Sequence, residues 1–464
     1  MPEDPRPPAA DLTARLDRIP ATRQLGGLVL RLSLGAFFEM FDLFLTGYLS
    51  PLLVRAGIFR PGGHGFWGLP DQATFAAATF SGLFAGALLF SSAADRFGRR
   101  PIFTYSLLWY TAATLLMATQ STAMGIDLCR FIAGVGIGVE LVTIDAYLAE
   151  LVPKQVRVRA FALSAAVQFL AIPAVACLCW LLAGRNPGGI AGWRWVLLAS
   201  ASGAIVVWAI RAGLPESPRW LIRRRRLAEA GRVTAALEAR AQSELGRPLP
   251  PPGPAPGKDE ETSGKFAEIW RPPYRRRTLM LVVFNFFQTI GFYGFSNWLP
   301  QLLAAQGATV LQSLHYAFLV AIAYPLAPLL FLPVADRFEP KWQVVCAAVG
   351  IGGFGLLFSL QRWPAALIGC GILVTISNCF LSFAYHAYQT ELFPTRVRAR
   401  AVGFCYSWSR LSTVFSSFMI GFFLQHFGAR GVFAFIAASM LAVIVSIGGF
   451  GPRTRGLALE AISP

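Results

Sequence analysis

The chain has 464 residues, of which 55% are hydrophobic and only 14% are charged. Soluble domains carry about 25% charged residues, so this composition excludes an ordinary soluble protein and indicates one that lies in a lipid bilayer. The formal net charge of +17 would suggest nucleic acid as a partner of a soluble chain. The placement of the charges explains it better, and we expect no nucleic acid to bind.

Apolar runs near 20 residues recur along the whole chain, and each can cross a hydrocarbon core of about 30 Å. The predicted spans are 26–54, 73–93, 101–120, 124–151, 158–183, 191–213, 278–303, 313–334, 342–361, 364–390, 400–425 and 432–452. The polar segment 1–25 lacks the short apolar core and cleavage site of a signal peptide. We therefore expect the first span to be retained.

The positive charges predict the orientation. With an even number of spans, about 31 of the 41 Lys and Arg residues fall on the side of the two termini, against about six in the opposite loops. Loops rich in Lys and Arg stay in the cytoplasm. We expect a multi-pass protein of the inner membrane with cytoplasmic N- and C-termini, the latter within 453–464.

The longest segment without an apolar run is 214–275, which we interpret as a linker. Leu227, Ala230, Val233 and Leu237 recur at helical spacing within it and predict a short helix on the membrane surface. A stretch rich in proline, glycine and charge follows, GRPLPPPGPAPGKDEETSGK, and favours a flexible connection. The linker separates two predicted domains, 26–213 and 276–452.

These two domains resemble one another. ADRFGRR at 94–100 is matched 241 positions later by ADRFEPK, and DAYLAELVPKQVRVRA at 145–160 is matched at the same offset by HAYQTELFPTRVRARA. An offset of 249 pairs FFE at 37–39 with FFQ at 286–288. Three matching blocks in order indicate a duplication of six spans, and parallel halves of this kind are an architecture of transporters.

The repeated loops are similar to those of the major facilitator superfamily. DRFGRR after the second predicted span, PESPRWL at 215–221 and E-L-x-P-x-x-x-R after spans 4 and 10 together resemble its sugar-porter, synaptic-vesicle-like and organic-ion branches, including bacterial metabolite:proton symporters of the nicotinate type. The resemblance covers about 26–452. It implies an all-α membrane protein of 12 transmembrane helices in two pseudo-symmetric six-helix bundles, working by alternating access.

The loop motifs bring acidic and basic residues to helix ends that face the cytoplasm. Such pairs can hold the helices in one state and release them in another, although one surface ion pair contributes only about 0–1 kcal/mol. The alternative is that these charges set the topology and face solvent. The candidate gating residues are Asp95, Arg96, Arg99, Glu150, Arg157, Asp336, Arg337, Glu391 and Arg398.

Ionisable residues within spans are functional candidates, because each costs about 2.5–3.5 kcal/mol at a helix centre. Asp42 in span 1 and Arg130 in span 4 match the carboxylate–arginine pair of the proton-coupled sugar porters. By that resemblance Asp42 is the first candidate for the proton carrier, and Glu39, one turn earlier, is able to share or replace it. The alternative is a static ion pair between Asp42 and Arg130.

Arg410 in SWSRLST has no counterpart in the other half, where Gln168 and Phe169 stand. Organic-anion carriers of the related branch place an arginine at this spacing after the E-L-x-P motif. A guanidinium offers a planar fork of donors that can hold a carboxylate through two hydrogen bonds. The alternative is that Arg410 is the partner of a carboxylate in span 1.

Other polar and aromatic residues complete a predicted substrate cavity. His386 takes the repeat position of Asp145 and is a candidate for this cavity. The alternative is that His386 has a hydrogen-bonded structural role. The run FFQTIGFYGFSNW lacks the glutamine pair of the sugar porters, which weakens a hexose assignment. The remaining candidates for substrate binding are Gln288, Tyr293, Asn297, Gln168, Tyr388 and Trp408.

The predicted function is a secondary active transporter that carries a small organic anion, such as an aromatic or heterocyclic carboxylate, with protons. A proton-coupled sugar or polyol porter is the alternative, and a membrane sensor that does not transport is the alternative of another class. The seven cysteines show no metal-ligand spacing, and no nucleotide-binding loop or catalytic triad stands out. We expect no metal, cofactor or enzyme activity, and a monomer.

Overall fold

The computed structural model describes residues 9–60, 69–90, 96–211, 214–252, 266–335 and 337–455. Within these ranges the regular elements are all helices. Eight of the described helical stretches are long and apolar enough to cross a membrane, and one of them, Arg400–Phe450, is long enough to cross it twice. The predicted all-α fold class, with twelve transmembrane helices in two bundles, is confirmed.

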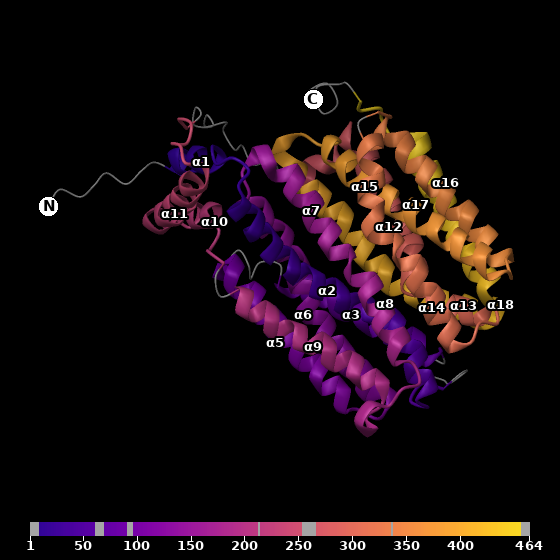
Figure 1. Cartoon of the computed structure of the whole chain (residues 1–464). Coiled ribbons are helices and arrows are strands. Elements are labelled where there is room, and N and C mark those ends of the chain that lie inside the picture. Colours follow the sequence, from indigo (N-terminus) through magenta and orange to yellow (C-terminus); the bar gives the residue numbers. More distant parts are fainter. Residues whose placement is uncertain are drawn as a thin grey trace.

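The first bundle contains six spans, and two short helices in line make up the fifth. Its helices are α2 (Arg23–Arg55), α3 (Asp71–Phe90), α5 (Arg99–Thr119), α6 (Ala123–Leu151), α7 (Arg157–Phe169) with α8 (Ala171–Leu182), and α9 (Gly192–Arg211). Figure 1 shows them in indigo to magenta, packed side by side with their axes close to parallel.

The second bundle repeats this arrangement in orange and yellow (Figure 1). Its helices are α12 (Tyr274–Ser296) with α13 (Leu299–Ala305), α14 (Val310–Ala321) with α15 (Ala323–Ala335), α16 (Pro340–Leu360), α17 (Pro364–Glu391) and α18 (Thr395–Phe450). The predicted spans 400–425 and 432–452 are joined in α18, whose backbone breaks at Gly428 with φ 64° and ψ −166°.

Proline explains why three spans divide into two helices. A proline within a helix lacks an N–H donor, and its ring collides with the carbonyl four residues earlier. Pro173, Pro300 and Pro325 each lie four residues after the end of a helix, at Phe169, Ser296 and Ala321 respectively. These prolines favour the breaks in spans 5, 7 and 8, although α2 continues without a break through Pro51.

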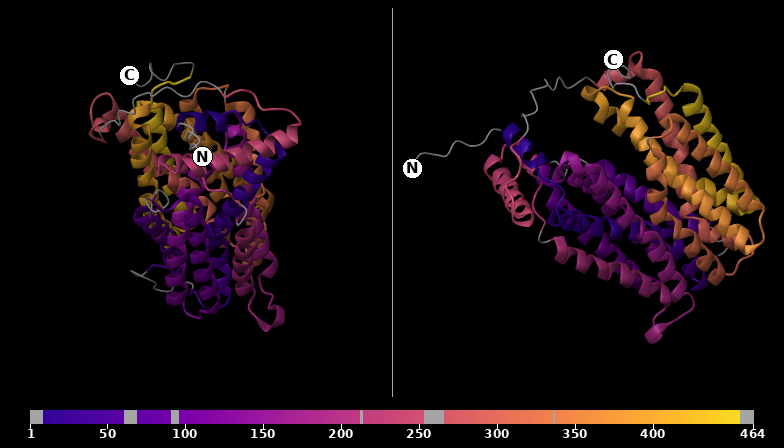
Figure 2. Two further views of the ribbon diagram at one scale, coloured as in Figure 1. Left: turned by 90° about the vertical axis from the view of Figure 1, so that its left-hand side faces the viewer. Right: turned by 45° about the horizontal axis from the view of Figure 1, so that its top comes forward.

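The two ends of the bundles differ. The linker face is the end at which α1 (Ala9–Asp17), α10 (Pro218–Arg223), α11 (Leu227–Leu245) and η4 (Phe266–Trp270) lie, and the short-loop face is the opposite end. Figure 2 shows α1 and α11 side by side, outside the first bundle. The predicted linker helix is α11.

α1 is held on α11 by apolar packing and by charge. Leu12 packs with Trp220 and Ala230, and Arg15 and Arg18 pair with Glu238 at 2.6 and 2.7 Å. Burial alone would raise the pKa of Glu238, but the hydrogen bonds from the two arginines outweigh it and lower the pKa. The described part of the segment before the first span, from Ala9 on, is thus part of the folded linker face.

The two bundles are in close contact at the short-loop face. A Cβ added to Gly47 of α2 would lie 2.1 Å from the carbonyl oxygen of Asn297 in the second bundle. The Gln301 side chain donates to the carbonyl of Gly47 at 3.1 Å, and the rings of Trp180 and His315 stack at 4.5 Å. These contacts seal the molecule between the bundles at this end.

We predict that Gly47→Ala opens the short-loop face, because the added methyl group cannot fit against Asn297. Overpacking of this kind costs about 1–3 kcal/mol, which shifts an equilibrium between two states by roughly 5- to 150-fold. Labelling of single cysteines at this face, or spin-label distances across it, will measure the shift.

Gly26→Ala is the matched control, because Gly26 lies in the same helix and a Cβ there meets nothing within 4 Å. Equal accessibility in the two variants would contradict the prediction.

Candidate functional site

A fully buried ion pair lies inside the first bundle. Arg130 of α6 donates to a carboxylate oxygen of Asp42 on α2 at 2.9 Å, and neither side chain is exposed. The guanidinium also donates to the Thr46 hydroxyl at 2.7 Å and, through Nε, to that of Thr79 at 3.1 Å. The sequence predicted the pair but not the two threonines.

The other Asp42 oxygen is occupied as well. It accepts from the Ser200 hydroxyl of α9 at 3.1 Å and from that of Thr114 on α5 at 3.4 Å. Burying two charges is stabilising only when their remaining donors and acceptors are satisfied. Five helices of the first bundle supply these groups, so the pair ties that bundle together.

Arg410 lies at the centre of a second cluster, between the bundles. Its guanidinium is 5.1 Å from the centre of the Tyr406 ring, one turn earlier on α18, and donates to the Tyr406 hydroxyl at 3.4 Å. Tyr293 of α12 and Tyr385 of α17 interact with it electrostatically. A cation is thus surrounded by three phenol groups from three helices.

The first bundle contributes Glu39 to this cluster. Glu39 is 1% exposed and interacts electrostatically with Arg410 and with Tyr293. The alternative partner predicted for Arg410, a carboxylate of span 1, is therefore present, and it is Glu39, whereas Asp42 is paired with Arg130. The cluster brings one negative and one positive side chain together from opposite bundles.

His386 lies beside the cluster and is partly accessible. Its ring packs on Tyr385 with centroids 4.1 Å apart and faces Tyr406 at 6.0 Å. Nδ1 lies 2.7 Å from the carbonyl of Ser382, so this nitrogen is the donor. The hydrogen-bonded arrangement fits the structural role that was the alternative for this residue.

Aromatic rings from both bundles meet between the cluster and the short-loop face. Phe80 of α3 lies against Tyr293 with centroids 5.0 Å apart, and Phe44 of α2 lies 6.1 Å from Tyr324 and 6.5 Å from Phe292. Such rings exclude water over a large area. They separate the charged cluster from the sealed end of the molecule.

The comparisons with known proteins agree with this arrangement. The family model described as "Sugar (and other) transporter" matches residues 29–464. The chain belongs to this family. The putative metabolite transport protein YyaJ of Bacillus subtilis is 30% identical over 97% of both chains, and the niacin transporter NiaP of Acinetobacter baylyi is 26% identical over 97% of this chain and 99% of that one.

Solved structures show the same fold. The inward-open xylose transporter XylE of E. coli superposes with a TM-score of 0.72 at 17% identity, over 94% of this chain and 99% of that one. The protein is therefore a multi-pass membrane transporter of the major facilitator superfamily and not an enzyme. Among the described residues no group of three or more His, Cys, Asp and Glu side chains could hold a metal ion.

In this transporter the other predicted polar residues are buried or half-buried. Gln288 is 7% exposed and its amide donates to the Thr289 hydroxyl at 3.4 Å. Asn297 is buried at the short-loop contact, where Gly47 approaches its backbone. Gln168 donates to the Ser164 hydroxyl at 3.0 Å within α7.

Two predicted substrate contacts lie elsewhere. The Tyr388 hydroxyl donates to the carbonyl of Pro452 at 2.8 Å, so its side chain is fixed at the end of α18. Trp408 packs edge-on to Phe404, which in turn contacts Trp270 of η4. Neither interaction is with the Arg410 cluster, and we leave both residues out of the proposed site.

At the linker face, Glu150 is the centre of the predicted gating network. Its carboxylate accepts from Arg99 at 3.1 Å and from the Ser217 hydroxyl at 2.7 Å, and it also pairs with Arg223. The partners come from the start of α5 and from α10. The motif residues therefore join two transmembrane helices of the first bundle to the linker.

Glu216 of PESPRWL has a role that the sequence did not reveal. Its carboxylate accepts from the backbone N–H groups of Arg99 and Arg100 at 3.1 and 3.4 Å and so caps the start of α5. Burial raises the pKa of Glu216, and these N–H groups only partly oppose the rise.

The other gating candidates that the structure describes make separate contacts. Arg157 donates to the carbonyl of Val152 at 3.4 Å, and Arg398 donates through Nε to the carbonyl of Phe393 at 3.1 Å. Arg96 and Arg337 are exposed, and Glu391 is partly exposed. Asp95 and Asp336 lie outside the described residues, so the gating role stays a prediction.

We predict that Asp42→Asn strongly destabilises the protein, because it leaves the Arg130 charge buried without its counter-ion. Loss of one partner of a buried pair costs about 3–5 kcal/mol, whereas replacing both partners with neutral groups is often close to neutral. The free energy of unfolding in detergent should therefore fall for Asp42→Asn and recover in Asp42→Asn/Arg130→Met.

Glu229→Gln is the control, since it breaks the exposed pair with Arg226 at 2.6 Å, which contributes about 0–1 kcal/mol. If Asp42→Asn costs no more than Glu229→Gln, the account of the buried pair is wrong.

Proposed function

We propose that this transporter carries a small organic anion, an aromatic or heterocyclic carboxylate, together with a proton by alternating access. The observation that carries the proposal is the position of Arg410, a half-buried cation between the bundles that interacts with Glu39 and three tyrosines. A neutral sugar has no need of such a cation. An organic anion does need such a cation, because an opposite charge must compensate for the loss of hydration when the anion leaves water.

The chemistry of the cluster suits a carboxylate attached to a planar ring. The guanidinium holds a carboxylate through two parallel hydrogen bonds, and the hydroxyl groups of Tyr293, Tyr385 and Tyr406 add donors. The rings of these residues offer faces for stacking. The name of the relative NiaP, a niacin transporter, supports a pyridine carboxylate or a similar molecule as the first substrate to test.

Coupling to protons follows from the competition between two anions for one cation. While Glu39 is charged, it neutralises Arg410 and disfavours the substrate carboxylate. A proton on Glu39 removes that competition, so proton and substrate bind together. Because Asp42 already accepts from Arg130, Ser200 and Thr114, we assign the exchanging proton to Glu39 and a supporting role to Asp42.

The orientation is part of the proposal. The linker face carries Arg99, Arg219 and Arg223, together with most of the positive charge, and the positive-inside rule assigns it to the cytoplasm of the inner membrane. The contacts of Gly47 and Trp180 then seal the outer side. In this state the Arg410 cluster is open to the cytoplasm, and rocking of the bundles gives access to the other side. We expect a monomer to be sufficient.

A sugar or polyol remains the second candidate, favoured by the description of the family and by the xylose-proton symporter among the solved structures. A thermal-shift screen of carboxylates, starting with nicotinate, against sugars selects the substrate, because a ligand at a hundredfold excess over its Kd stabilises by about 2.7 kcal/mol.

We predict that Arg410→Gln weakens binding of the selected carboxylate by about tenfold or more, since a hydrogen bond to a charged group contributes about 1.5–3 kcal/mol. Arg430→Gln, which changes an exposed arginine of the same helix, is the control.

Glu39→Gln should keep exchange of labelled substrate in proteoliposomes but lose accumulation driven by a pH gradient.

Unchanged uptake in Arg410→Gln would refute the anion assignment, and uphill accumulation in Glu39→Gln would refute the proton assignment.

A further inference from the structure

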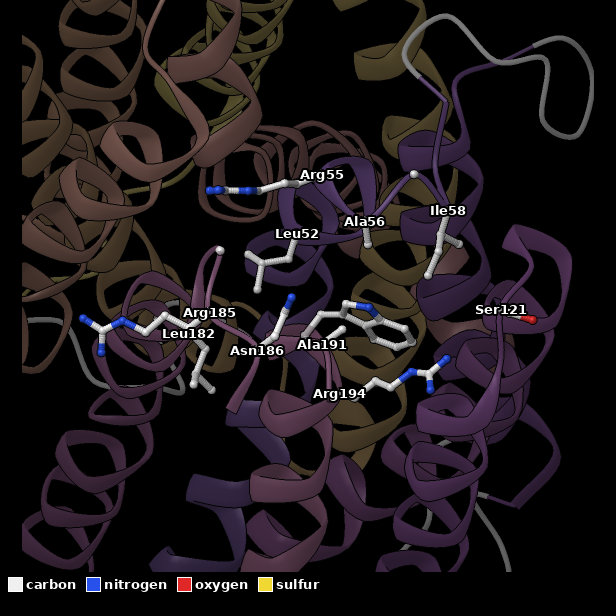
Figure 3. Close-up of a pocket in the computed structure, with 14 residues that line it drawn as sticks. Leu52, Arg55, Ala56, Ile58, Ser121, Leu182, Arg185, Asn186, Ala191 and Arg194 are labelled. Carbon is white, nitrogen blue, oxygen red and sulfur yellow. The ribbon is translucent and has the colours of Figure 1, made fainter. Parts of the chain in front are cut away.

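A separate pocket of about 580 Å³ opens at the short-loop face of the first bundle. It lies between the end of α2, the turn between α5 and α6, the turn between α8 and α9, and the start of α9. Three arginines line it: Arg55 from α2, Arg185 from the turn and Arg194 from α9. Figure 3 shows that the guanidinium groups of Arg185 and Arg194 point to opposite sides of the pocket. No acidic residue is among the described residues that line this pocket.

This gathering of positive charge is unusual for its position. Six arginines lie at or near the short-loop ends of the helices, and half of them line this one pocket. The six are Arg55, Arg60, Arg185, Arg194, Arg362 and Arg430. Loops on the outer side of a membrane are normally poor in Arg and Lys. No carboxylate is among the described residues that line the pocket beside these three arginines, so the charged side chains that an anion would meet there are all positive.

The backbone adds to the positive potential. The pocket includes Gly192 and Trp193, the first residues of the 20-residue helix α9, and a helix N-terminus carries about half a positive charge. The first turn of α9 contains no acidic residue. It contains Arg194 instead, a cation where an anion is favoured. The buried Nε of Arg194 has no hydrogen-bond partner among the described residues, and its Nη2 donates to the carbonyl of Gln120 at 3.3 Å.

Arg55 is placed by a glycine. A Cβ on Gly184 would lie 2.5–2.8 Å from the guanidinium of Arg55, so the guanidinium rests directly on the Gly184 backbone. The φ of Gly184 is 77°, a conformation that residues with a side chain rarely adopt. The turn between α8 and α9 is therefore shaped to accommodate the Arg55 head group at the pocket.

The rest of the lining is apolar, and the surroundings are those of a membrane boundary. Leu52, Ile58, Leu182 and Trp193 line the pocket beside the arginines. Large apolar side chains that are exposed in the structure lie within three positions of lining residues in the sequence: Met124, Leu181, Ile190 and Trp195. Of these, Trp195 is of a residue type that is enriched at the level of the lipid head groups.

From these observations we propose that the pocket binds the phosphate of an anionic phospholipid, with the acyl chains against the neighbouring apolar residues. In the orientation proposed above, the lipid belongs to the outer leaflet. Every lining residue comes from the first bundle, so the site persists while the bundles rock. The site does not depend on the identity of the transported substrate, and its test does not measure transport.

The test is native mass spectrometry of the purified full chain with added phosphatidylglycerol, compared with phosphatidylcholine. We expect wild type to bind one phosphatidylglycerol more tightly than the rest, and Arg55→Gln/Arg194→Gln to bind it about tenfold more weakly, as expected when charged hydrogen bonds are lost. Arg362→Gln/Arg430→Gln, which removes two short-loop arginines of the second bundle, should bind as wild type does.

A second variant keeps the proposal testable if the loss of Arg194 disturbs packing. Arg185 is exposed in its turn, so Arg185→Glu should weaken lipid binding without a change in melting temperature. A thermal shift with inorganic phosphate separates the two sources of the anion. Equal retention of phosphatidylglycerol by all variants would overturn the proposal. Stabilisation by inorganic phosphate that only the pocket variants lose, with lipid retention unchanged, would overturn the lipid in favour of a soluble anion.

Discussion

A charge within a bilayer must be met by an opposite charge or by oriented polar groups, and two arginines impose that requirement here. Arg130 meets it inside one bundle, where Asp42, Thr46 and Thr79 accept hydrogen bonds from the guanidinium. Arg410 meets it between the bundles, with Glu39 on the far side. The Arg130 pair ties the helices of the first bundle together. The Arg410 cluster joins the two bundles to each other. From these positions we propose that the pair of Arg130 is structural and that the pair of Arg410 takes part in transport.

The rest of the fold supports that division. Aromatic rings and the close contact at Gly47 seal one end, while Glu150 and Glu216 fasten the start of α5 to α10 at the other. Contacts within each bundle are thus separate from contacts between them. Rocking of the bundles can break the contacts between them and leave the contacts within each bundle intact, as the proposed alternating access requires.

Hydropathy and the internal repeat predicted most of the architecture, because in lipid a spanning backbone has to be helical. The breaks at Pro173, Pro300 and Pro325 were not predicted, although the sequence contains the prolines that favour them. The ion pair of Asp42 followed from resemblance. Partners across helices could not be read from one sequence, since Ser200 lies 158 positions from Asp42 and only packing brings them together. Tyr406 could have been found one turn before Arg410. Trp408, two positions away, lies on another face of the helix, which explains its absence from the cluster.

The central claim is that Glu39 and the substrate carboxylate compete for Arg410. The affinity of the purified protein for that carboxylate, measured by calorimetry between about pH 6 and 8, tests it most directly. Binding linked to one proton should strengthen as the pH falls, by up to about tenfold per unit, and in Glu39→Gln it should not depend on pH. A pH dependence that persists unchanged in Glu39→Gln would contradict the account.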